Sequence, residues 1–154
     1  MIFLVALLLG MVSGLRAMLP LAAVAWATRA GWLDFGDSWL ALLGNAWAPW
    51  ILTLLALGEL VADKLPSTPS RTVPVQFGAR LVVGAAAGAL LALGTGAPWI
   101  GGLAAGLAGA IGGTLAGRAL RARLASAFGR DLPAALLEDA TAIAAAWLLL
   151  RAVA

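Results

Sequence analysis

Four ionisable residues could support chemistry inside an otherwise apolar sequence. Glu59 and Asp63 are four residues apart, so their side chains share one face of a helix. Arg16 and Glu138 each lie within another long apolar segment. A charge at the centre of a bilayer costs about 2.5 to 3.5 kcal/mol on insertion scales, so such residues normally face one another or a wet cavity. We therefore expect these residues to meet in a shared site or in buried ion pairs.

The composition indicates an integral membrane protein. Of the 154 residues, 63% are hydrophobic and 11% are charged, whereas soluble proteins are about half apolar and about a quarter charged. The length fits one domain over residues 1–154. The net charge of +3 comes from basic residues scattered along the chain, which suits a positive-inside bias better than a nucleic-acid surface. The expected partner is the lipid bilayer, and no nucleic acid is expected.

The chain has no cysteine and no histidine. Disulfides, thiolate nucleophiles, and the usual zinc and haem ligands are therefore excluded. Oxygen ligands from Glu59, Asp63 and Glu138 would favour magnesium or calcium, but we predict no metal site and no cofactor. The sequence contains no recognisable pairing of a nucleophile with a base. We expect the protein not to be an enzyme, with an enzyme acting on a lipid phosphate at the paired carboxylates as an alternative.

Apolar segments separated by polar or proline-rich stretches predict an all-α, polytopic transmembrane helix bundle of about five spans. A polar loop with three prolines at 66–74 separates the second span from the third. A short interfacial helix is predicted at 39–43. The predicted spans are 2–28, 47–64, 80–95, 100–120 and 134–152.

The first apolar segment is too long for a simple crossing. Its 28 residues would reach about 42 Å as a helix, which exceeds the hydrocarbon core of roughly 30 Å. Gly14, Arg16 and Pro20 mark the place where we expect the segment to break or kink. One interpretation is a single broken span, and the other is a re-entrant hairpin that folds at 13–20.

Charge and tryptophan positions predict an orientation. Five alternating spans place the N-terminus and the loops at 65–79 and 119–132 on one side. That side is basic and should be cytoplasmic, with the N-terminus inside and the C-terminus outside in a bacterial inner membrane; Arg151, on the outside, is an exception. The basic residues concerned are Lys64, Arg71, Arg80, Arg118, Arg121, Arg123 and Arg130. The aromatic belt expected on the opposite side comprises Trp26, Trp32, Trp39, Trp47, Trp50, Trp99 and Trp147.

Glycines in the fourth predicted span recur every three or four residues, so they form one stripe along a helix. Such stripes let helix backbones approach closely. They indicate either packing within one chain or the seam of a homo-oligomer. The stripe consists of Gly102, Gly106, Gly109, Gly113 and Gly117.

The charged residues have a functional and a structural interpretation. A path for a small solute, an ion or a proton would use Arg16, Glu59, Asp63, Glu138 and Arg118. A pair between Arg16 and either Glu59 or Glu138 could instead only fix the helix register. Under the structural interpretation, Asp63, Lys64 and Asp139 are interfacial anchors.

Three motifs resemble those of a bacterial membrane family known as domain of unknown function 4126. They are SGLRAMLPL at 13–21, ELVADKLP at 59–66 and LED at 137–139. The resemblance covers nearly the whole chain. It implies a polytopic membrane protein and supports the choice of Arg16, Glu59, Asp63 and Glu138, but it implies no substrate.

We therefore expect a small transporter or channel that uses intramembrane carboxylates and arginines. The alternative is a structural or assembly protein that forms homo-oligomers through its glycine-rich helices.

Overall fold

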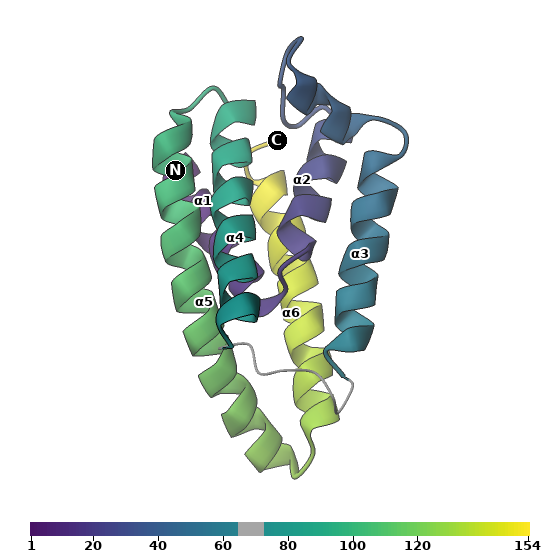
Figure 1. Ribbon diagram of the computed structural model, residues 1–154, viewed down its shortest axis with the longest axis vertical. Coiled ribbons are helices and arrows are strands. Elements are labelled where there is room, and N and C mark those ends of the chain that lie inside the picture. The colour runs from purple at the N-terminus through teal and green to yellow at the C-terminus, as the bar shows by residue number, and fades with distance from the viewer. Residues whose placement is uncertain (65–72) are drawn as a thin grey trace.

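The computed structural model describes residues 1–64 and 73–154. These residues form six α-helices and one 3-10 helix, and they contain no strand. The helices are α1 (Ile2–Leu15), α2 (Leu19–Arg29), η1 (Trp39–Gly44), α3 (Ala48–Ala62), α4 (Pro74–Gly94), α5 (Trp99–Phe128) and α6 (Asp131–Arg151). The predicted all-α bundle is confirmed (Figure 1).

Three of these helices, α4, α5 and α6, are long and apolar enough to cross a membrane. Helices α1 and α3 are also apolar but have only 14 and 15 residues. At 1.5 Å per residue, α3 reaches about 22 Å and α4 about 31 Å. These lengths and compositions fit a membrane protein.

Prolines and glycines set the helix boundaries. Pro20, Pro49 and Pro74 each lie in the first turn of a helix, where a missing N–H breaks no intrahelical hydrogen bond. Gly96 and Gly129 follow α4 and α5 with φ of 72° and 65°, which glycine adopts without strain. Most of the predicted loop at 66–74 falls on residues 65–72, outside the described part of the chain, but its last residue begins α4.

Helix α5 is longer than the predicted fourth span. It continues to Phe128, so Arg121 and Arg123 lie on a helix instead of in a loop. The predicted short helix at 39–43 is present as η1.

Helices α1 and α2 form a hairpin, so the predicted break near Gly14 to Pro20 is confirmed and 2–28 is not one continuous helix. The arrangement is the one expected of the hairpin interpretation. Helix α1 descends in Figure 1, the chain reverses, and α2 returns to the end where α1 began. Along α1, Gly10 faces Gly106 and Gly14 faces Gly113, so α1 runs in the same direction as α5. Both termini consequently lie at the same end of the bundle (Figure 1).

The two ends of the bundle differ in residue type. We call them the tryptophan end and the basic end. The tryptophan end carries Trp26, Trp32, Trp39, Trp47, Trp50, Trp99 and Trp147. The basic end carries Lys64, Arg118, Arg121, Arg123 and Arg130, while Arg71 lies outside the described residues. Helix α1 begins at the tryptophan end and α2 returns to it, so the N-terminus lies at that end. The expectation that the N-terminus shares a side with the basic loops is therefore wrong.

The glycine stripe of α5 packs against α1 and α4 of the same chain. A methyl group added at Gly106 would overlap the carbonyl oxygen of Gly84 on α4, and one added at Gly113 would overlap that of Met11 on α1. All five stripe glycines are buried. The stripe therefore packs within one chain, which is the first of the two interpretations of its glycines.

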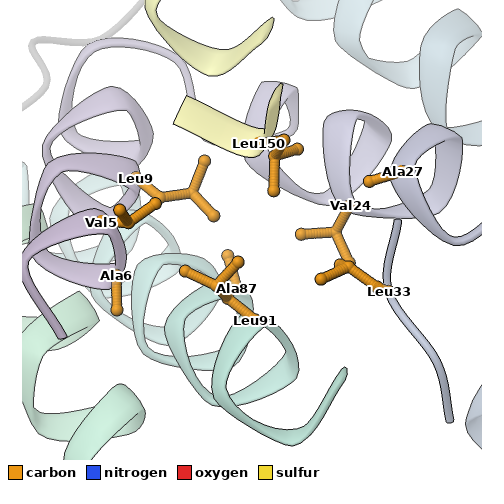
Figure 2. Packing of buried hydrophobic residues seen from close by; sticks show 9 residues of the cluster. All are labelled: Val5, Ala6, Leu9, Val24, Ala27, Leu33, Ala87, Leu91 and Leu150. Carbon is orange, nitrogen blue, oxygen red and sulfur yellow. The ribbon is translucent and has the colours of Figure 1, made fainter. Parts of the chain in front are cut away.

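The apolar core lies in the half of the bundle nearer the tryptophan end. It joins α1, α2, α4 and α6 with the loop after α2 (Figure 2). Its buried residues are Val5, Ala6, Leu9, Val24, Ala27, Leu33, Ala87, Leu91 and Leu150. Helix α3 contributes nothing to this core; it packs on α2 and η1, and only Pro49 and Ala56 are buried among its residues.

Candidate functional site

The turn of the hairpin is the centre of the candidate site. Continuing α1 as a helix would bring the ring of Pro20 against the carbonyl of Arg16, four residues earlier. Arg16 instead takes an extended conformation, with φ of −140° and ψ of 111°, and ends α1. Three residues separate α1 from α2, so two helix ends with unpaired backbone groups meet inside the bundle.

Side chains from other helices satisfy both ends. Nη1 of Arg80, on α4, donates to the carbonyl oxygens of Gly14 and Leu15 at 3.0 and 2.9 Å. Glu59, on α3, accepts hydrogen bonds of 2.7 and 2.8 Å from the backbone N–H groups of Ala17 and Met18. A cation thus lies at the C-terminus of α1 and an anion at the N-terminus of α2, which is the arrangement that the helix dipoles favour.

Arg16 is fully buried and reaches two further helices. Its Nε donates a 2.7 Å hydrogen bond to Oδ1 of Asp139 on α6. Its Nη1 forms an ion pair with Oδ2 of Asp63, just after α3. Oδ2 of Asp139 also accepts a 2.6 Å hydrogen bond from Nζ of Lys64, so this carboxylate lies between two cations.

Arg121 closes the group on the side of α5. Its Nη1 lies 3.5 Å from Oε2 of Glu138 and 3.8 Å from Oδ2 of Asp63. Its other nitrogens bind Asp131, which is largely exposed, at 2.6 and 2.9 Å. Together with the 3.7 Å pair between Arg80 and Glu59, these contacts define what we call the charged cluster. It consists of Arg16, Glu59, Asp63, Lys64, Arg80, Arg121, Glu138 and Asp139.

Among the described residues, the charged cluster joins four cations and four carboxylates, and Asp131 adds a fifth carboxylate at its exposed edge. Its side chains range from 1% exposed for Arg16 to 26% exposed for Lys64. Arg80 lies six residues into α4, about 9 Å from its start, and Asp139 lies about 12 Å into α6. The cluster therefore lies inside the bundle and not at its tip. Charges buried in this way are costly unless they are paired.

Helix registers explain why Arg80 and Asp139 point inward. Arg80 is four and eight residues before Gly84 and Gly88, which lie on the buried face of α4. Asp139 is on the face of α6 that buries Ala135 and Ala142. Each charged side chain thus extends a stripe of small residues that already faces the hairpin.

The structure brings most of the predicted site residues together. Arg16, Glu59, Asp63 and Glu138 all belong to the charged cluster. Arg118 is exposed on α5, and Arg121, about one turn later, supplies the arginine of that helix instead.

The pairing differs from the predicted one. Arg16 pairs with Asp63 and Asp139 rather than with Glu59 or Glu138. The charged cluster also contains Asp63, Lys64 and Asp139. The structural interpretation of the sequence had placed these three residues at the membrane interface. Arg80 and Asp139 were absent from the predicted path, and their register with small residues was the signal that could have identified them.

A small cavity of about 80 Å³ adjoins the cluster between α5 and α6. Leu15, Arg121 and Glu138 are among the residues that line it. A single water molecule needs about 10 to 15 Å³ of cavity volume, so this cavity has room for a few water molecules beside the ion pairs. Within residues 1–64 and 73–154, no three acidic side chains are grouped so that they could hold a metal ion.

Comparison with known proteins bears on the family to which the chain belongs. No curated protein and no solved structure matches the chain. A family model described as Domain of unknown function (DUF4126) matches residues 3–152, and the chain, matched over nearly its whole length, belongs to that family.

Proposed function

We propose that the protein is a small membrane transporter or channel in which the charged cluster binds a proton or small ion on its way through the bundle. The observation that carries the proposal is the buried Arg16, held by Asp63 and Asp139 at the turn between α1 and α2. Non-helical backbone at membrane depth is tolerated where it is buried in protein or lines a water-filled cavity. Transporters often bind their ions at such helix breaks.

The contacts of Asp139 suggest how a proton or cation could be accommodated. Its two oxygens bind different cations, Arg16 and Lys64. Lys64 is the most exposed member of the cluster, and it is also held by the carbonyl oxygen of Leu60, so it can leave Asp139 and keep one of its partners. A cation could therefore replace this lysine beside Asp139.

The proposal includes an orientation. By the positive-inside rule, the basic end faces the cytoplasm of a bacterial inner membrane, and both termini lie on the other side. The proposed activity is ion movement and not an enzymatic reaction.

Flux through vesicles tests the proposal. Purified protein is reconstituted in liposomes that contain a pH-sensitive dye, and proton entry is measured under a potassium diffusion potential. Sodium, potassium and chloride are tested with corresponding dyes. We expect flux of one of these ions in wild type, loss of that flux in Asp139→Asn and Asp63→Asn, and no loss in Asp37→Asn, which changes an exposed carboxylate near the tryptophan end. Equal fluxes in empty and protein-containing vesicles for all four ions would contradict the proposal.

A second candidate is a structural role, favoured by the position of α3. Among the described elements, α3 makes extensive contacts only with α2 and η1. Its C-terminal end is joined to Arg16 by Asp63 and to Asp139 by Lys64. In that case the same substitutions would lower stability, and wild type would conduct nothing. A homo-oligomer remains a prediction, to be measured by native mass spectrometry of the purified protein.

A further inference from the structure

An apolar groove of about 470 Å³ lies between α2, α3 and α6. Its walls are formed almost entirely by alanine, leucine, isoleucine and tryptophan side chains. Ala22 and Trp26 of α2, Ala56 and Leu57 of α3, and Ile143 and Trp147 of α6 are among them. The groove has the size of a ligand pocket but lacks the charged groups with which polar ligands are oriented.

The one hydroxyl on the wall of the groove is already satisfied. Oγ1 of Thr53 accepts a 3.0 Å hydrogen bond from Nε1 of Trp26 and donates a 2.7 Å bond to the carbonyl oxygen of Pro49. A hydrogen-bond acceptor in the groove would lose its hydration without gaining a donor from this hydroxyl. The groove therefore suits a hydrocarbon occupant.

The occupant is expected to come from the bilayer. The groove is flanked by α3, which is peripheral, and by α6, which is long and apolar enough to span. Leu57, Ile143 and Trp147 on its walls are about half exposed, at 51%, 46% and 53%. An acyl chain of the bilayer can cover these apolar side chains without burying any polar group.

Arg151 does not line the groove, but it stacks on Trp147, which does. The guanidinium carbon of Arg151 lies 5.4 Å from the ring centroid of Trp147, and Arg151 is exposed. Tryptophan and arginine at a helix end are typical of the headgroup region of a membrane. An exposed arginine at the membrane surface also attracts an anionic headgroup by its charge.

We propose that the groove binds one acyl chain of an anionic phospholipid from the surrounding bilayer, with the lipid phosphate beside Arg151. This inference is independent of ion movement through the charged cluster, which adjoins the opposite end of α2.

Native mass spectrometry tests the inference directly. Wild-type protein is exchanged into vesicles of equal amounts of phosphatidylglycerol and phosphatidylethanolamine, and is then released in mild detergent. Ala56→Phe places a ring in the groove, whereas Ala108→Phe adds the same ring at an exposed position of α5. We expect one retained phosphatidylglycerol per chain in wild type and in Ala108→Phe, and about tenfold less in Ala56→Phe. Arg151→Gln should remove the preference for phosphatidylglycerol.

Fluorescence quenching tests the position of the chain without obstructing the groove. One equivalent of phospholipid brominated on its acyl chain is added to protein in detergent, and quenching of tryptophan emission is recorded. Trp147→Phe should lower the quenched fraction, whereas Trp39→Phe, on η1 and outside the groove, should not. Equal lipid retention by Ala56→Phe and Ala108→Phe, or equal quenching in both tryptophan variants, would overturn the inference.

Discussion

Nε of Arg16 donates a 2.7 Å hydrogen bond to Oδ1 of Asp139, although the two residues are 123 positions apart in the sequence. The bond joins the turn of the hairpin to α6. Because Lys64 binds the other oxygen of Asp139, this single carboxylate connects three separate parts of the chain. Its removal should affect the fold and any ion movement together.

Asp139→Asn is predicted to be strongly destabilising. Loss of one partner from a buried pair leaves an uncompensated charge, which typically costs about 3 to 5 kcal/mol. The matched control is Asp131→Asn, since the Asp131 side chain is 60% exposed at the edge of the same network and an exposed pair contributes less than about 1 kcal/mol. Thermal unfolding in detergent measures both, and equal effects would contradict the buried pairing.

Glu59 is predicted to hold the start of α2 through both of its oxygens. Glu59→Gln keeps one acceptor but loses the negative charge at the helix N-terminus, for an expected loss of about 1 kcal/mol. Glu59→Ala leaves the N–H groups of Ala17 and Met18 without their acceptor, for an expected loss of about 2 to 3 kcal/mol.

Hydrogen exchange provides the specific measurement for this cap. Deuterium uptake in a peptide covering residues 16–19 should rise most in Glu59→Ala, less in Glu59→Gln and not at all in Asp37→Asn. Unchanged uptake in Glu59→Ala would mean that the carboxylate does not protect these backbone groups.

The sequence predicts helices well but does not decide how the first segment folds. Its apolar pattern is the same for a broken crossing and for a hairpin. The choice depends on Arg80 and Glu59, which satisfy the two helix ends from α4 and α3, and neither contact is visible in local sequence. Pro20 predicts the position of the break, but not the direction that the chain takes afterwards.

The candidate site was predictable where charges lie deep in apolar segments. Arg16 and Glu59 were identified in this way. Asp139 was interpreted as an interfacial anchor, and its register with the buried Ala135 and Ala142 is what places it inside the bundle. Specific pairs depend on how helices rotate against one another, which glycine contacts between α1, α4 and α5 determine.

Two adjacent glycines of α5 should respond differently to alanine. A methyl group at Gly113 would overlap the carbonyl oxygen of Met11 on α1, whereas nothing lies within 4 Å of one at Gly112. Gly113→Ala is expected to lower stability by about 1 to 3 kcal/mol or more through overpacking, and Gly112→Ala to raise it by up to about 1 kcal/mol through helix propensity. Thermal unfolding compares the two variants. Light scattering should find the oligomeric state unchanged in both, and a change specific to Gly113→Ala would indicate that a second copy uses the stripe.

The hairpin also makes a prediction about sides of the membrane, and the absence of cysteine from the chain makes it simple to test. Single cysteines are introduced as Ser38→Cys in the loop after α2, Ser126→Cys near the end of α5 and Ala154→Cys at the C-terminus, and a fourth is added before Met1. Because α1 and α2 enter and leave at one end (Figure 1), an impermeant maleimide should label the N-terminal cysteine, Ser38→Cys and Ala154→Cys from the same side, and Ser126→Cys from the other. A first segment that crossed the bilayer would instead place the N-terminal cysteine with Ser126→Cys. That result would contradict the hairpin. It would also contradict the charged cluster, because the cluster forms where the ends of α1 and α2 meet.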